Sequence, residues 1–140
     1  MALLIKMTSI IGVITDLEGK ILLAKKGHTP GHKLSDRWHF PGGTKLHCET
    51  PEDCIMREMY EETGLYVNPK LLSQQDKASR CHRFFYYLCK PTGGHLRAGG
   101  DVVEVNWFTK QQTEKILGYD LIRQYPRRVQ ELVIPSLVFQ

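Results

Sequence analysis

The sequence WHFPGGTKLHCETPEDCIMREMYEETGL, residues 38–65, carries three glutamates within five positions. In an α-helix, which turns by about 100° per residue, Glu58, Glu61 and Glu62 lie within roughly 100° of arc. Glu58 and Glu62 form an i,i+4 pair of like charge, which costs on the order of 0.3 kcal/mol even when exposed. Arg57 alone cannot neutralise three carboxylates, so the cluster needs either solvent or another cation.

The flanking residues indicate where this helix begins and ends. Thr50 can act as the N-cap, and Pro51 suits the first helical position. Gly64 is a typical stop because glycine readily adopts a left-handed conformation. We therefore predict a helix over residues 51–63. Four apolar residues on the remaining arc are expected to pack on a sheet: Ile55, Met56, Met59 and Tyr60.

The three glutamates alone are consistent with two interpretations. An acidic stripe in contact with solvent is common on surface helices. Alternatively, hard divalent cations bind carboxylate oxygens, and Mg²⁺ commonly brings phosphate oxygens into the same coordination shell.

The spacing of the surrounding residues favours the second interpretation. Gly43 is followed after five residues by Glu49, and after seven more by REMYEETGL, residues 57–65. This matches the Nudix box, G-x5-E-x7-R-E-U-x-E-E-x-G-U, at every fixed position. For seven fixed residues, a chance match has a probability on the order of 10⁻⁷ or less.

The resemblance to the Nudix hydrolase family, in its compact MutT-like form, covers residues 10–108. It implies an α/β (α+β) fold, an α/β/α sandwich with a mixed β-sheet and a loop–helix–loop catalytic box. We expect a single domain over residues 1–140. The family hydrolyses nucleoside diphosphates linked to another group, X, with Mg²⁺ or Mn²⁺.

The resemblance also implies roles for individual residues. Glu58, Glu61 and Glu62 are the expected metal ligands, with the Gly43 carbonyl as a further one. Arg57 would hold the glutamates by ion pairing. Glu49 would pair with Arg57 or assist at an outer metal.

Attack of water on phosphorus also needs a group that accepts a proton. We expect Glu61 or Glu62 in this role, although some family members use an acidic residue on a loop beyond the box. The candidates there are Asp101, at the end of a glycine-rich loop, and Glu104, which is equally consistent with an exposed strand residue.

The rest of the chain predicts strands before and after the central helix, which favours a sheet flanked by helices. The expected strands are residues 10–15 and 20–24 as a hairpin, a short extended segment at 38–40, 83–89 and 102–108. Between the strands we expect a turn at Pro41-Gly42-Gly43 and a loop at 90–101. After the last strand we expect two helices: one capped by Thr109 that ends at Leu117, and one at 120–133 that is interrupted or kinked at Pro126.

No motif defines X. The sequence lacks the proline that the ADP-ribose subgroup carries beyond the box, the NADH subgroup's SQPWPFPxS array and the coenzyme A subgroup's upstream motif. A nucleoside triphosphate is therefore the leading substrate, with ADP-ribose or another nucleotide sugar as the alternative. A prenyl diphosphate isomerase would carry extra motifs in a longer chain. A non-catalytic nucleotide-binding domain would not need the cost of three clustered glutamates.

Side chains that could contact a nucleotide are not singled out by pattern. Strand aromatics can stack on a base but more often belong to a core: Trp38, Phe84, Phe85, Tyr86, Tyr87 and Trp107. Basic residues before the box either meet phosphates or stay solvated: Lys25, Lys26, Lys33 and Arg37. The six histidines show no metal-ligand spacing.

Composition restricts the class of protein. A content of 41% hydrophobic and 24% charged residues is typical of soluble globular proteins. The net charge of +4 is mild and no dense basic block is present, so stable nucleic-acid binding is not expected. Four cysteines without CxxC spacing favour reduced thiols in a cytoplasmic protein.

The opening MALLIKMTSIIGVIT is expected to lead into a core strand rather than a signal peptide or membrane span. The expected oligomeric state is a monomer or homodimer.

Overall fold

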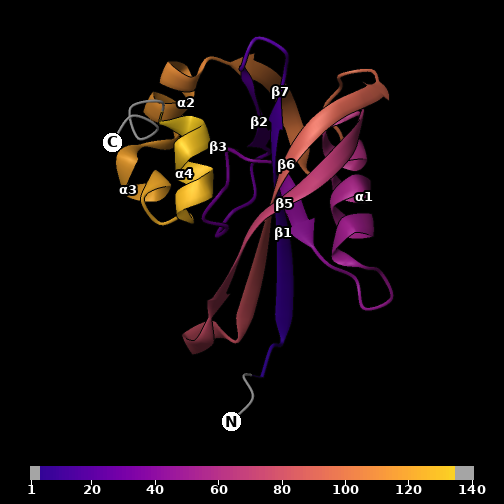
Figure 1. Ribbon diagram of the computed structural model, residues 1–140, viewed down its shortest axis with the longest axis vertical. Coiled ribbons are helices and arrows are strands. Elements are labelled where there is room, and N and C mark those ends of the chain that lie inside the picture. The colour runs from indigo at the N-terminus through magenta and orange to yellow at the C-terminus, as the bar shows by residue number, and fades with distance from the viewer. Residues whose placement is uncertain (1–3, 135–140) are drawn as a thin grey trace.

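The computed structural model describes residues 4–134, in which a mixed β-sheet lies between α1 on one side and α2, α3 and α4 on the other (Figure 1). The single domain expected over residues 1–140 extends beyond the described residues at both ends. The elements are β1 (Met7–Thr15), β2 (Ile21–Lys26), β3 (Trp38–His39), β4 (Gly42–Thr44), α1 (Pro51–Thr63), β5 (Leu65–Lys77), the 3₁₀ turn η1 (Ala78–Arg80), β6 (His82–Gly94), β7 (Val102–Phe108), α2 (Lys110–Leu117), α3 (Tyr119–Ile122) and α4 (Arg127–Val133).

The sheet has the strand order β3-β2-β1-β6-β5, with β4 also paired to β1 and β7 to β2. The β1–β6 pairing is parallel and the others are antiparallel. This mixed sheet between helices confirms the predicted α/β/α sandwich. None of the helices in residues 4–134 is long and apolar enough to cross a membrane.

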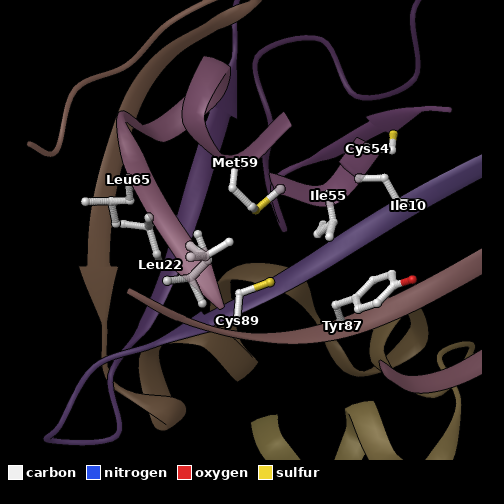
Figure 2. Close-up of a cluster of buried hydrophobic side chains, with 10 residues drawn as sticks. Ile10, Leu22, Cys54, Ile55, Met59, Leu65, Tyr87 and Cys89 are labelled. Atoms are coloured by element: carbon white, nitrogen blue, oxygen red, sulfur yellow. The ribbon is translucent and has the colours of Figure 1, made fainter. Parts of the chain in front are cut away.

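Strand β1 is buried on both faces, which explains its continuous apolar run. Side chains alternate between the two faces of a strand. Ile10 and Ile14 therefore join the core under α1, while Val13 joins the core under the other helices. Figure 2 shows the first of these cores, in which Ile55 and Met59 of α1 face the sheet.

Helix α1 has the predicted bounds. The Thr50 hydroxyl accepts a hydrogen bond from the Asp53 amide at 3.1 Å, and Gly64 adopts the left-handed conformation with φ 77°. The predicted apolar face is too wide, however, since Met56 and Tyr60 remain 41% and 38% exposed.

The structure differs from the prediction in one strand and one loop. The strand β5 was not predicted, because its sequence lacks regular alternation and contains Pro69; as an edge strand paired only with β6 it tolerates the proline. The first residues of the loop predicted at 90–101 belong to β6. The interruption predicted at Pro126 within residues 120–133 is confirmed: the segment forms two helices, α3 and α4, and Pro126 lies immediately before α4.

The turn predicted at Pro41-Gly42-Gly43 is also wrong, because Gly42 and Gly43 lie in strand β4 and neither has a positive φ. The two glycines instead permit close packing. A Cβ atom on Gly42 would overlap the carbonyl oxygen of Ile10, and one on Gly43 would overlap the Glu58 carboxylate. Strand β4 therefore fits between β1 and α1 because it has no side chains at these positions.

Replacing Gly42 should weaken this packing. We expect Gly42→Ala to lower the free energy of unfolding by about 1–3 kcal/mol, the usual cost of overpacking. Gly93→Ala is the matched control, because a Cβ there would meet only the Tyr66 ring at an ordinary 3.7 Å. Urea unfolding measures both, and equal stability of the two variants would contradict the proposed packing constraint.

Candidate active site

Arg57 contacts three carboxylates at once. Its Nε and Nη2 donate to the two oxygens of Glu49 at 3.0 and 2.7 Å. Its Nη1 donates to Glu58 at 2.9 Å and to Glu61 at 3.2 Å. Arg57 thus connects the loop before α1 with the acidic edge of the helix.

Glu49 is committed to this pairing. Besides the two bonds from Arg57, its carboxylate accepts one from the Leu46 amide at 2.8 Å. Hydrogen bonds from the Arg57 guanidinium, and to a smaller extent from the Leu46 amide, lower the pKa of Glu49 to about 2. The structure therefore shows Glu49 as the partner of Arg57, and a role at an outer metal stays a prediction.

Glu62 lies in the opposite environment. It is only 9% exposed, and its Oε1 accepts a hydrogen bond from the Gly42 amide at 2.9 Å. Burial raises its pKa to about 8, with repulsion from Glu58 and Asp101 adding to the shift. Burial likewise raises the pKa of Glu58, against the opposing effect of Arg57. These two carboxylates lie where water is scarce and positive charge is insufficient.

A cleft of about 500 Å³ opens beside them. One wall is formed by Glu58 and Glu62 together with the β4 glycines, and Lys26 and Asp101 also border it. The other lining residues are mainly apolar or aromatic, among them Phe40, Phe84, Leu121 and Tyr125. The cleft therefore combines charged groups with flat, apolar ones.

Asp101 reaches this cleft because its loop is attached to the end of β2. The Gly27 amide donates to the Asp101 carbonyl at 2.9 Å, and the Lys26 ammonium lies 3.6 Å from the Asp101 carboxylate. Glu104 is exposed on β7, opposite Lys25, and does not line the cleft.

The residues present fit a divalent cation by their chemistry. No three His, Cys, Asp or Glu side chains within residues 4–134 converge on a single point that could hold a metal. Glu61 is 52% exposed and is engaged with Arg57. Glu58 and Glu62 nevertheless offer carboxylate oxygens beside Gly43, where the absence of a Cβ leaves room, and oxygen ligands suit Mg²⁺ and Mn²⁺.

The aromatic residues mostly confirm the core interpretation. Tyr86 and Tyr87 are buried, and the remaining strand aromatics pack against the two cores. Phe84 alone of the six also lines the cleft. Tyr125 was missed because it belongs to the segment between α3 and α4, which matches no motif; an aromatic residue directly before a proline was its only signal.

Comparisons with known proteins place the chain in a family. The NUDIX domain model matches residues 6–127. A MutT-like protein from Streptomyces ambofaciens is 29% identical over 108 residues, which make up 76% of this chain and 66% of that protein. An ADP-ribose pyrophosphatase from Methanocaldococcus jannaschii is 33% identical over 122 residues, or 81% of this chain and 70% of that protein.

A solved structure supports the fold. The crystal structure of a NUDIX hydrolase from Nitrosomonas europaea superimposes with a TM-score of 0.73 at 20% identity, over 91% of this chain and 72% of that chain. This chain belongs to the Nudix hydrolase family, and the predicted class of enzyme, a pyrophosphohydrolase, is confirmed.

The burial of Glu62 predicts how the thermal stability of the metal-free protein changes with pH. A carboxyl whose pKa rises on folding destabilises the folded state once it ionises, so its unfavourable effect grows between pH 4.5, its ordinary pKa, and about 8. Glu62→Gln removes this charge and should raise the melting temperature in EDTA by about 3 °C or more at pH 8, the effect of roughly 1 kcal/mol in a domain of this size. The gain should shrink at about pH 5.

Calorimetry at both pH values measures this difference. The exposed Glu104→Gln is the matched control and should show no pH-dependent gain. A Glu62→Gln gain that is absent at pH 8, or equal at both pH values, would contradict the electrostatic assignment.

Proposed function

We propose that this chain is a divalent-cation-dependent hydrolase that cleaves the pyrophosphate linkage of a nucleoside 5′-triphosphate, releasing the monophosphate and pyrophosphate. The supporting observation is the cleft that joins two under-neutralised carboxylates, the buried Glu62 and the half-buried Glu58, to the lining residues Phe84 and Tyr125, which we call its aromatic end. Pyrophosphate hydrolysis depends on positioning and charge neutralisation more than on a covalent contribution from the protein.

Different groups that line the cleft would contact different parts of the substrate. The β4 backbone, without side chains at Gly42 and Gly43, allows phosphate oxygens to approach the main chain closely. Lys26 offers a positive charge to the phosphates from the end of β2. Phe84 and Tyr125 offer ring faces or edges to the base. The substrate would then lie with its phosphates at the carboxylates and its base at the aromatic end.

Glu58 and Glu62, with the Gly43 carbonyl, would hold the cation, and Glu61 would join them when released from Arg57. A bound Mg²⁺ or Mn²⁺ supplies neutralisation of the phosphate charge and a more acidic water. Glu49 keeps Arg57 in place through its two hydrogen bonds.

A carboxylate must accept the proton of the attacking water. We place this role in the pair Glu61 and Glu62, with Asp101 as the alternative beside Lys26. Glu62 lines the cleft, Glu61 is the more solvent-accessible of the pair, and Asp101 is 86% exposed at the rim.

A second candidate substrate is ADP-ribose. It is favoured by the relative from Methanocaldococcus jannaschii, which is named an ADP-ribose pyrophosphatase. The same site would cleave it to AMP and ribose 5-phosphate. Comparing the hydrolysis of a panel of nucleoside triphosphates with that of ADP-ribose decides between the two.

Cleavage should depend on the metal and should occur within the pyrophosphate linkage. Activity should be lost in EDTA and return with millimolar Mg²⁺ or Mn²⁺. In ¹⁸O-labelled water, label should enter one phosphate product, as mass spectrometry of the products would show. Full turnover in chelator would exclude the metal role. Release of free nucleoside, or comparable hydrolysis of p-nitrophenyl phosphate, would indicate a general phosphatase.

Single substitutions test the glutamates. Glu58→Gln, Glu61→Gln and Glu62→Gln keep the size of each side chain and should each lower kcat by roughly 10²-fold or more if the group is a ligand or the proton acceptor. Asp101→Asn tests the alternative acceptor, and Glu104→Gln serves as the control outside the cleft. Steady-state kinetics with saturating Mg²⁺ measure all five variants. A near-normal rate in any glutamate variant would refute the role proposed for that residue.

A further inference from the structure

Three basic residues lie in the two segments that adjoin the Phe84 end of the cleft, and the proposed reaction gives them no role. Lys77 ends β5 and Arg80 ends η1, at the tip of the β5–β6 hairpin. Lys33 lies between His32 and Leu34, which line the cleft. We call Lys33, Lys77 and Arg80 the distal basic cluster. Figure 1 shows the hairpin tip extending past the loop between β2 and β3.

The cluster directly adjoins Phe84. The Lys77 ammonium lies 5.2 Å from the centre of the Phe84 ring, and the His82 ring stacks on Phe84 at 4.0 Å. His82 is fixed in turn by a 2.8 Å hydrogen bond with the hydroxyl of Ser9, which also lines the cleft. Lys77 and His82 are therefore held against Phe84, in the wall where the base is expected to lie.

The strand register places Phe84 between this cluster and the carboxylates. Along the parallel β1–β6 pair, Phe84 is level with Ser9, while His82 is level with Met7 and pairs across to Lys77. The next residues of β1, Ile10 and Ile11, pair with the β4 glycines beside the glutamates. A base beside Phe84 in the cleft would have its 5′ phosphates on one side and the distal basic cluster on the other.

The like charges in the cluster are not neutralised by the protein. No member of the cluster forms an ion pair within the described part of the chain, and the neighbouring Asp76 is bound by Arg83 at 2.8 and 3.0 Å. Burial, Arg80 and Lys33 lower the pKa of Lys77. Gathering cations in this way is unfavourable unless an anion occupies the space between them.

We propose that the distal basic cluster is a second anion subsite, which binds a phosphate carried on the ribose 2′- or 3′-oxygen of the nucleotide whose base lies beside Phe84 in the cleft. The proposal rests on the proposed function for the orientation of the nucleotide. The 5′ phosphates are occupied at the carboxylates, so the ribose hydroxyls are the positions left for a second phosphate. Lysine and arginine bind phosphate through charge-assisted hydrogen bonds.

Equilibrium binding tests the subsite without turnover. The ligands are AMP, adenosine 3′,5′-bisphosphate, adenosine 2′,5′-bisphosphate and the dinucleotide pApA, none of which contains a pyrophosphate linkage. Isothermal titration calorimetry with Mg²⁺ should show at least one bisphosphate binding about tenfold or more tightly than AMP. This advantage should decrease with added salt. If pApA shares it, the phosphate source is an oligonucleotide strand; if only a bisphosphate shows it, the source is a small nucleotide.

Substitutions test whether the distal basic cluster causes the tighter binding of a bisphosphate relative to AMP. Lys77→Gln with Arg80→Gln should abolish it, and Lys33→Gln in the separate loop should reduce it independently of the hairpin. Lys70→Gln, an exposed lysine farther along the same strand, is the matched control and should retain it. Equal affinity for AMP and both bisphosphates, or an advantage that survives in the double variant, would overturn the subsite. Because nothing is hydrolysed, this failure is distinct from a failure to cleave nucleoside triphosphates.

Discussion

The site depends on the position of one guanidinium group. Arg57 donates two hydrogen bonds to Glu49 and one each to Glu58 and Glu61, so a single cation orients three of the four glutamates at fixed positions of the box. Glu62 is not among its partners and depends on the Gly42 amide instead. The protein thus provides enough positive charge to order the acidic edge of α1, but not enough to neutralise it. A divalent cation would complete that balance.

This arrangement requires a backbone without side chains on the facing strand. Glycine at 42 and 43 lets β4 pair with β1 while α1 packs close above it. The same core residues that attach α1 to the sheet, Ile55 and Met59, therefore also fix the distance between the carboxylates and the β4 backbone. Stability and site geometry are coupled through this contact.

The sequence was informative where local spacing determines structure. The caps and bounds of α1 follow from Thr50, Pro51 and Gly64, and the Glu49–Arg57 pairing follows from the resemblance to the Nudix box. It was uninformative where tertiary contacts decide the structure. The edge strand β5 shows no regular alternation of apolar and polar residues. The glycines of β4 were predicted as a turn, since the sequence does not reveal that Ile10 and Glu58 lie too close to these positions to allow a side chain. Tyr125 enters the cleft only through the packing of α3 and α4, which no local pattern reveals.

Direct measurement of metal binding tests the central claim most simply. Mn²⁺ can be followed by electron paramagnetic resonance, because its signal broadens on binding. The wild-type protein should bind Mn²⁺ without nucleotide, and Glu58→Gln with Glu62→Gln should weaken that binding by roughly tenfold or more, whereas Glu104→Gln should not. Unchanged Mn²⁺ affinity in the double variant would contradict the claim that Glu58 and Glu62, beside β4, form the metal site.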